Sequence, residues 1–212
     1  MTNDVLRAYY LRQLGLTEWI RQPVSITENH LAPLDLLASE VSACTRCVLH
    51  QSRTQTVFAR GNPNSSLMII GEAPGFHEDK EGVPFIGKAG ILLNKMLHSI
   101  GLSEQSVYIA NVLKCRPPEN RDPRVEEIAA CQDYLQRQIT LVNPKLILAV
   151  GRFAGQFLLK QSLSLSKMRQ AVHDYEGKPV IVSYHPAYLL RNAAEKRNAY
   201  GDLLRVKQLL SQ

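Results

Sequence analysis

Residues 67–75 read LMIIGEAPG, an apolar run that ends in a turn bounded by glycines. The run is short and unbroken, which is typical of a buried strand. Similar apolar runs occur at 107–113, 146–150 and 180–183, and each is followed by a stretch of helical character. Strands that alternate with helices are typical of a mostly parallel sheet with helices on both faces. The sequence therefore predicts an α/β fold of three layers, α/β/α, around a central four-stranded, mostly parallel sheet.

The helices are expected between and after these strands. Apolar residues recur at helical spacing over 90–100, which predicts one helix there. A second helix is predicted to open at Asp122-Pro123, because a capping residue precedes a proline at the first helical position. Two further helices are predicted at 152–160 and at about 195–210.

The chain is expected to have two parts. Residues 1–35 are predicted to form an N-terminal helical extension with a linker, since a polar, proline-containing stretch follows the first apolar face. Residues 36–212 are predicted to form the main domain. A short helix over 34–41 is expected to lead into the first pair of cysteines.

Composition indicates a globular protein that favours polyanions. The 212 residues are 45% hydrophobic and carry a formal net charge of +6, with a sequence pI of about 9.2. Nucleic acid is the default partner of such a basic protein. There is no apolar run of the ~20 residues that a membrane span requires, and the first twelve residues have no apolar signal-peptide core. We therefore expect a cytoplasmic protein without membrane contact, in which disulfides are disfavoured.

The four cysteines form a candidate metal site. They stand as Cys44-x-x-Cys47, Cys115 and Cys131, and none is left over. Four thiolates make one complete ligand shell. Zinc sites commonly use a second close pair, whereas Cys115 and Cys131 are widely separated, a spacing that an iron–sulfur cluster also accepts. Spacing alone leaves three alternatives, which are an iron–sulfur cluster, zinc and free buried cysteines.

Polar residues gather near the carboxyl ends of the predicted strands. These positions are 71–75, Asn111, Gly151 and His185-Pro186. In open α/β sheets the ligand crevice lies outside the carboxyl ends of the strands, so these distant segments are expected to face one site. Each is a weak signal alone. The turn exposes one carboxylate, a single histidine is more often structural, and Asn111 either braces a loop or reads a ligand.

Taken together, four motifs are far more specific. They are GEAPG at 71–75, EGVPFIGKAG at 81–90, NVLKCRPP at 111–118 and HPA at 185–187. This combination closely resembles the family 4 uracil-DNA glycosylases, the iron–sulfur enzymes of bacteria and archaea that remove uracil from DNA. The resemblance covers residues from about 36 to 210, including all four cysteines, but not the N-terminal segment.

The resemblance implies a function, a cofactor and a partner. A [4Fe–4S] cluster would be held by Cys44, Cys47, Cys115 and Cys131. The partner would be uracil-containing DNA, single- or double-stranded, and the enzyme would act as a monomer. It would flip uracil out of the strand and hydrolyse the N-glycosidic bond, leaving an abasic site for base excision repair. No metal would enter this chemistry, because water attacks a cation-like sugar.

The resemblance also assigns roles to residues. Glu72 would position the attacking water, Asn111 would read the base through its amide, and His185 would hydrogen-bond uracil O2. Phe85 would stack on the flipped base, and Glu78 would form a wall against a 5-methyl group. Ala73 and Gly75 complete the expected substrate-binding set. The expected DNA-binding residues are Arg116, Tyr188, Leu189 and Arg191.

Three other functions are weighed against this one. A related protein that captures uracil-DNA covalently uses an inserted basic loop with a nucleophilic histidine, and no histidine lies between Cys115 and Cys131. A non-catalytic iron–sulfur or zinc nucleic-acid-binding module is disfavoured by the intact Glu72, Asn111 and His185. A small-molecule α/β enzyme that uses the turn at 71–75 for phosphate is weakly disfavoured by the basic pI.

Overall fold

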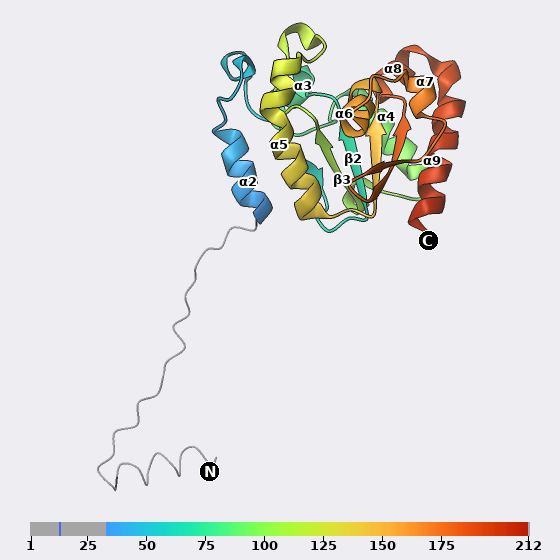
Figure 1. The fold of residues 1–212 in the computed structure, drawn as a ribbon, viewed down its shortest axis with the longest axis horizontal. Coiled ribbons are helices and arrows are strands. Elements are labelled where there is room, and N and C mark those ends of the chain that lie inside the picture. Colours follow the sequence, from blue (N-terminus) through green and yellow to red (C-terminus); the bar gives the residue numbers. More distant parts are fainter. Residues whose placement is uncertain (1–12, 14–32, 212) are drawn as a thin grey trace. The chain divides into compact units, whose positions relative to one another are not determined.

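The computed structural model describes residues 13 and 33–211, and within them the predicted α/β fold is confirmed (Figure 1). One six-stranded sheet has the order β1-β3-β2-β4-β6-β5. The strands are β1 (Arg60–Gly61), β2 (Leu67–Gly71), β3 (Val107–Asn111), β4 (Leu146–Val150), β5 (His173–Tyr175) and β6 (Lys178–Ser183). Strands β3, β2, β4 and β6 pair in parallel, as the sequence predicts for the centre of the sheet.

The prediction of four strands is wrong, because two short antiparallel strands extend the sheet at its edges. Strand β1 has only two residues, too few to show a period of two. Strand β5 is short and largely polar, and it forms a hairpin with β6. The hairpin turns at Glu176 and Gly177, whose φ angles are +52° and +81°, the geometry of a two-residue turn with two left-handed positions.

Eight helices of the described residues cover the two faces and one end of the sheet (Figure 1). They are α2 (Pro33–Ser42), α3 (Phe76–Glu81), α4 (Lys88–His98), α5 (Val125–Val142), α6 (Arg152–Leu159), α7 (Leu165–Met168), α8 (Pro186–Arg191) and α9 (Lys196–Leu210). The short 3₁₀ turns are η1 (Val48–Gln51), η2 (Glu104–Ser106), η3 (Pro118–Asn120) and η4 (Ala193–Glu195).

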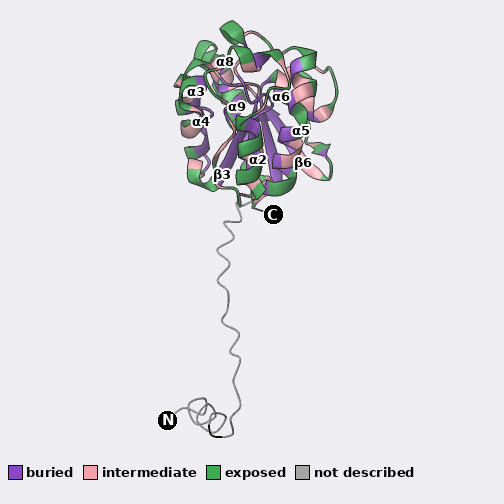
Figure 2. Cartoon of the chain, turned by 90° about the vertical axis from the view of Figure 1, so that its left-hand side faces the viewer, coloured by how far each residue is buried: buried purple, intermediate pink, exposed green. Residues whose placement is uncertain are grey.

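Alternate residues of the central strands enter different halves of the core. Leu67 and Ile69 pack in a cluster with α4, α8 and α9. Met68 and Ile70 pack in a second cluster with α5, α6 and α7. All five residues of β2 are buried. In Figure 2 the strands of the sheet are purple, the colour of buried residues, and the helices around them are largely green and pink. Burial on both faces explains why this strand reads as an unbroken apolar run.

The predicted start of the longest helix is wrong by a few residues. Helix α5 begins at Val125, and Arg124 occupies the N-cap position. The backbone N–H of Arg124 donates to Glu127 Oε2 at 2.9 Å, so a glutamate at the third helical position caps the helix. Asp122 does not cap α5. Its Oδ2 lies 3.7 Å from Arg152 Nη2 at the start of α6.

The described residues from 33 onward belong to one compact unit. The helix expected over 34–41 is confirmed as α2, which begins at Pro33, ahead of the predicted boundary at 36. The extension predicted for 1–35 lies outside the described residues except for 13 and 33–35, and it stays a prediction. No helix of the described part of the chain is both long and apolar enough to cross a membrane.

Candidate active site

A cleft opens where the strand order reverses. From β2 the chain moves to β3 on one side, and from β3 it crosses back to β4 on the other side of β2. A crevice is expected outside the carboxyl ends of strands at such a switch point. The cleft has a volume of about 400 Å³, within the ~300–1,000 Å³ typical of small-molecule sites. It is lined by Glu72, Ala73, Pro74, Gly75, Glu78, Ala89, Pro117, Asn120, Arg121, His185, Ala187 and Arg191.

The side chains of Asn111 and Phe85 both lie against Gly71, the residue before the turn at 72–75. Gly71 and Asn111 are paired in the β2–β3 register. A Cβ atom on Gly71 would lie 2.4 Å from Asn111 Oδ1 and 2.5 Å from Phe85 Cζ, so only glycine permits this approach. Asn111 is 2% exposed and Phe85 is 6% exposed. They form a deeper layer than the residues that line the cleft.

The amide of Asn111 has unused hydrogen-bonding capacity. Its Oδ1 is buried and has no hydrogen-bond partner among the residues that the structure describes. Leaving a buried polar atom unpaired costs about 1–3 kcal/mol, and native proteins seldom tolerate it without a reason. The orphaned oxygen therefore marks a place where a ligand with a matching donor would bind.

Phe85 has an unusual backbone conformation that its surroundings enforce. Its φ is +56°, a region that bulky side chains rarely occupy and that is often found at functional sites. Gly90 in α4 lies so close that a Cβ there would be 1.6 Å from the carbonyl oxygen of Phe85. Arg60 Nη2 donates to the same oxygen at 3.3 Å. Sequence reasoning missed Arg60, since no local motif links it to Phe85.

Glu78 holds the Phe85 loop from the opposite side. Its Oε1 accepts hydrogen bonds from the backbone N–H groups of Ile86 and Gly87, both at 3.0 Å. A Cβ on Gly75 would lie 2.7 Å from Glu78 Oε2, so the carboxylate also presses against the turn at 71–75. Glu78 thus lines the cleft, as expected, while it also anchors the loop that carries the aromatic ring.

His185 is held as a neutral donor at the edge of the cleft. Its Nδ1 accepts a hydrogen bond from the backbone N–H of Ala187 at 3.2 Å, so the ring proton lies on Nε2. Burial, followed by the positive charge of Arg191, lowers the pKa of His185 to about 4. The His185 and Phe85 rings lie 5.7 Å apart between centroids. The imidazole is therefore uncharged near neutral pH.

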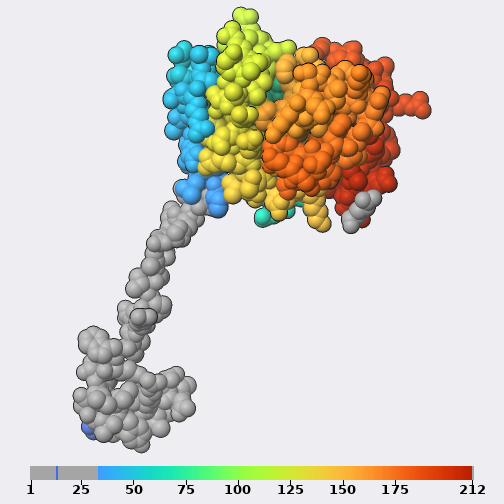
Figure 3. All heavy atoms as spheres, viewed as in Figure 1, coloured from blue at the N-terminus to red at the C-terminus, as the bar shows by residue number. Residues whose placement is uncertain are grey.

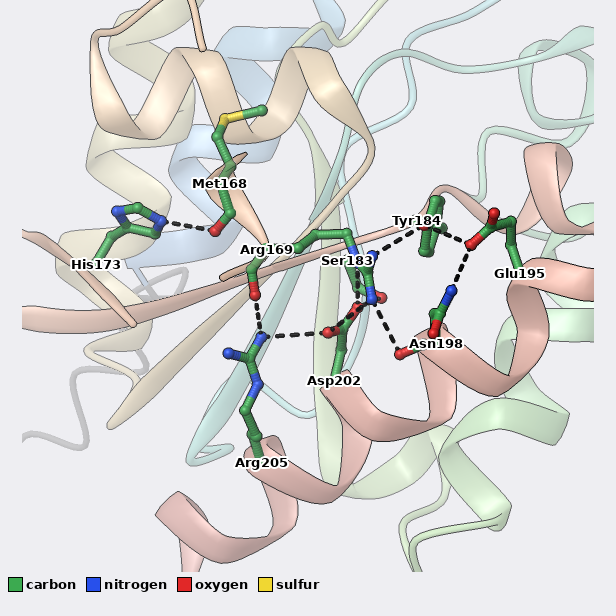
Figure 4. Close-up of polar contacts among 9 residues, drawn as sticks. All are labelled: Met168, Arg169, His173, Ser183, Tyr184, Glu195, Asn198, Asp202 and Arg205. Atoms are coloured by element: carbon green, nitrogen blue, oxygen red, sulfur yellow. Dashed lines mark hydrogen bonds and ion pairs between the residues drawn. The ribbon is translucent and has the colours of Figure 1, made fainter. Parts of the chain in front are cut away.

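A polar network fastens the strand end that precedes His185 (Figure 4). Ser183 Oγ donates to Asp202 Oδ2 at 2.8 Å, and Arg169 Nε donates to the same oxygen at 2.7 Å. Arg169 Nη1 also donates to the hydroxyl of Tyr184 at 2.9 Å. Both residues immediately before His185 are therefore tied to helices that lie beside the sheet, which limits how far the imidazole can move.

Glu72 lies in the turn after β2 with a perturbed carboxyl group. Burial raises its pKa to about 7, and the negative charge of Asp122 adds to the rise. The positive charge of Arg152 acts in the opposite direction. A carboxyl group in a cleft whose pKa is shifted toward neutrality is a candidate for a role in catalysis.

The expected DNA-binding residues divide into two groups. Arg191 is exposed and lines the cleft, and Tyr188 is 39% exposed and stacks on Tyr184 with 5.5 Å between ring centroids. Leu189 was predicted to contact DNA, but it is 1% exposed and belongs to the core beside α4. On a short helix, adjacent side chains point in different directions, and Leu190, 46% exposed, is the outward one.

Arg116 lies on the loop after Cys115, next to the cleft. Its Nε donates to Asn120 Oδ1 at 2.7 Å, and Asn120 itself lines the cleft. Its guanidinium carbon lies 5.1 Å from the centre of the Phe76 ring. The side chain is half-buried, so it is held near the mouth of the cleft by a hydrogen bond and by an aromatic ring.

Helices α2 and α5 pack side by side, as the blue and yellow parts of the chain show (Figure 3). The four cysteines come together near these two helices. Two of them follow α2, one follows β3 and one lies on α5, and all four line a single hollow. None forms a disulfide. The apolar residues of the third core cluster around them are Leu37, Val41, Leu49, Leu113 and Tyr134.

Three of the four cysteine sulfurs are hydrogen-bonded. Each of three sulfurs accepts one N–H hydrogen bond, an arrangement that stabilises thiolate ligands. The bonds run from Arg46 N to Cys44 Sγ at 3.5 Å, from Arg53 Nη1 to Cys115 Sγ at 3.1 Å and from Lys114 N to Cys131 Sγ at 3.3 Å. The four cysteines are therefore a donor set that suits a metal centre, and the N–H groups around them suit thiolate ligands.

Comparison with known proteins identifies the family of this chain. The family model described as the uracil DNA glycosylase superfamily matches residues 58–204. The chain is 42% identical to a type-4 uracil-DNA glycosylase of Archaeoglobus fulgidus over 83% of this chain and 92% of that protein. It is 40% identical to one of Thermotoga maritima over 84% and 95% of the two chains.

A more distant relative lies in a neighbouring group. A type-5 uracil-DNA glycosylase of Pyrobaculum aerophilum is 32% identical over 61% of this chain and 64% of that protein. The type-4 relatives match more of the chain at higher identity, and their matches reach beyond the family model. From the match of the family model and the extent of the type-4 alignments, this chain belongs to the uracil DNA glycosylase superfamily and, within it, to the type-4 uracil-DNA glycosylases.

Proposed function

We propose that this protein removes uracil from DNA by hydrolysing the bond between the base and the sugar, and that the buried Asn111 amide selects the base. The observation that carries the proposal is the unpartnered Asn111 Oδ1 beside Gly71 and Phe85. One amide accepts from uracil N3–H and donates to O4, whereas cytosine presents the reverse pattern. A site with buried polar groups rejects a base that leaves them unpaired.

The base must leave the DNA stack to reach this amide. Unstacking costs a few kcal/mol in a duplex and less in a single strand. Stacking on an aromatic side chain returns ~1–3 kcal/mol per base, and Phe85 would supply that ring. The fixed φ of +56° and the contacts with Gly90 and Arg60 keep this ring in place before the base arrives.

His185 would lower the barrier to bond cleavage. As the bond breaks, negative charge develops on uracil O2 and the sugar becomes cationic. The Nε2–H of His185 is free to donate because Nδ1 is already occupied by Ala187 N–H. A preorganised hydrogen-bond donor directed at the developing charge stabilises the transition state and makes a large contribution to the rate. The proton stays on the neutral imidazole, whose pKa is about 4.

Glu72 would act on the sugar side of the bond. An ionised carboxylate in this turn both orients the attacking water and stabilises the cationic sugar through space. Two basic side chains near the cleft mouth, the half-buried Arg116 and the exposed Arg191, would hold the phosphates on either side. Such contacts position the strand without reading its sequence.

We further propose that Cys44, Cys47, Cys115 and Cys131 hold a [4Fe–4S] cluster with a structural role. The support is the donor set of four cysteines around one hollow, with N–H groups directed at three sulfurs. When bound, the cluster would tie together α2, the loop after β3 and α5. The reaction would proceed on one copy of the chain, in the cytoplasm, where thiols stay reduced, and 36–212 would suffice as the catalytic domain.

The first test uses end-labelled oligonucleotides with one central uracil, with cytosine or thymine in matched strands. We expect a break after alkali at uracil alone, since an abasic site is alkali-labile. Asn111→Asp should lower uracil excision by at least about 100-fold, because a carboxylate cannot donate to O4. An uncut uracil strand would contradict the proposed activity, and a denaturation-resistant protein–DNA band would indicate covalent capture instead.

A second prediction follows from the pKa of Glu72, which is about 7. If the ionised form is active, the single-turnover rate should rise with pH and level off above about 7, because His185 no longer titrates there. Asp122→Asn removes a negative charge that raises the Glu72 pKa, so the rising limb should move to lower pH. Arg152→Gln removes the opposing positive charge and should move it to higher pH. If the pH–rate profiles of the two variants shift in the same direction, or if neither shifts, the role proposed for Glu72 is contradicted.

A further inference from the structure

Lys114 is buried deep in the protein, three residues beyond the end of β3. Its side chain is only 1% exposed. Lysine is almost never fully buried unless its ammonium group is paired, because removing the charge from water is costly. None of the roles proposed for the cleft uses this residue. A buried lysine that the protein retains at such a cost therefore calls for an explanation.

The ammonium group of Lys114 makes two hydrogen bonds inside the protein. Its Nζ donates to the backbone carbonyl oxygen of Asn111 at 2.7 Å and to Gln138 Oε1 at 2.5 Å. Gln138 is fully buried on α5, and its Nε2 donates to the Tyr108 hydroxyl at 3.0 Å. Gln138 is thus held on its other side, and it fixes where the ammonium group lies. From there, Lys114 holds the backbone of Asn111.

The backbone of Asn111 needs such support. With Oδ1 unpartnered before a base binds, no hydrogen bond at that atom orients the side-chain amide. Its direction then depends on the backbone from which it projects and on packing against Gly71 and Phe85. A bond that fixes the carbonyl group of Asn111 also fixes that backbone. Misplacing a reactive group by ~1 Å costs up to about 100-fold in rate.

The same lysine is connected to the cysteine site. Its backbone N–H donates to Cys131 Sγ at 3.3 Å, and the residue lines the hollow that the four cysteines share. Its carbonyl oxygen accepts from the backbone N–H of Val57 at 2.8 Å. One residue therefore contacts a candidate metal ligand through its backbone and the proposed base-reading residue through its side chain.

We propose that Lys114 is a positioning residue that couples the order of the cysteine site to the orientation of the Asn111 amide. It touches neither the base nor the sugar, and it acts through the carbonyl group of Asn111. The inference rests on the proposed function, since it gives Asn111 its part in base selection. It adds a specific reason why a structural metal centre lies beside this catalytic cleft.

The test compares Lys114→Met with Leu135→Ala in the full-length protein carrying its metal centre. Leu135 is fully buried on α5 and takes part in none of the hydrogen bonds of Lys114, so its truncation weakens the fold without removing a partner of Lys114. At a temperature where both variants stay folded, Lys114→Met should lower single-turnover excision by about 10- to 100-fold. It should also weaken binding of free uracil in calorimetry and leave DNA affinity unchanged. Leu135→Ala should keep the wild-type rate of excision, affinity for free uracil and affinity for DNA.

Two further arms make the result decisive. In an Asn111→Ala background, Lys114→Met should add little to the loss, because both changes act on one group. If Lys114→Met does not fold, Lys114→Gln takes its place. Losses that merely follow stability, as in Leu135→Ala, or losses that add fully to those of Asn111→Ala, would overturn the inference. Wild-type protein without uracil excision would instead overturn the proposed function.

Discussion

Replacing His185 with alanine is expected to slow uracil release by about 10²- to 10³-fold under single-turnover conditions, the usual cost of removing one donor to developing negative charge. The imidazole is a neutral donor with its proton on Nε2, held there by Ala187 N–H at Nδ1. Because it stabilises charge that appears only as the bond breaks, its loss should change the chemical rate and leave DNA affinity nearly unaltered.

The measurement is a single-turnover time course on uracil-containing DNA, paired with fluorescence anisotropy on a strand that carries an abasic site. His173→Ala is the matched control, because within the described part of the chain that ring bonds only the Met168 carbonyl oxygen, through Nε2 at 2.7 Å. The control should keep the full rate. A His185→Ala protein that binds DNA weakly but cleaves at the normal rate once bound would show that His185 is a binding residue and would refute its assignment to the chemical step.

The second large effect is expected from Cys131→Ser, which should abolish the metal centre and destabilise the fold by more than about 4 kcal/mol, a size associated with the loss of a metal or disulfide. Cys131 lies on α5, and the residues packed around the four cysteines include Leu37 and Val41 of α2. Without the proposed centre, α2 loses the link between its following loop and α5 that the cysteines would provide. The apolar contacts and the ion pair between Glu40 of α2 and Arg137 of α5 remain.

Visible absorption, iron and sulfide content, and urea unfolding would measure this effect in protein purified without oxygen. Gln132→Ser is the matched control, since Gln132 is the exposed neighbour on the same helix. The control should keep its colour and its unfolding midpoint. A Cys131→Ser protein with unchanged colour and stability would remove Cys131 from the ligand set.

The central sheet was predictable because the burial of each strand determines the residues of that strand itself. A strand covered by helices on both faces must be apolar at every position, so β2 and β4 appear in the sequence as unbroken runs. The edge strands lack this signal. Strand β1 is a two-residue pairing, and β5 is held by its hairpin with β6, so neither had an apolar pattern to detect.

The site was predictable in part for the same reason. Glu72 and Asn111 sit at the carboxyl ends of neighbouring parallel strands, and the topology of the sheet alone brings them together. Leu189 was expected at the surface, yet it is buried, because a run of apolar residues does not reveal which one faces the core. Arg60 and Lys114 were missed because their importance comes from contacts with the carbonyl oxygens of Phe85 and Asn111. Arg60 is 25 residues away from Phe85 in the sequence. Lys114 is close to Asn111 in the sequence, but its ammonium group is also bound by Gln138 of α5, which is distant in the sequence.

The close approach at Gly71 also limits how the site can diverge over evolutionary time. Even the methyl group of alanine would collide with Asn111 Oδ1 and with the Phe85 ring, and both neighbours are buried and have little room to retreat. Substitution of Gly71 is therefore excluded, whereas this constraint does not apply to the residues beside it. A descendant enzyme that came to prefer another damaged base would have to change Asn111 or Phe85 and inherit the glycine unaltered.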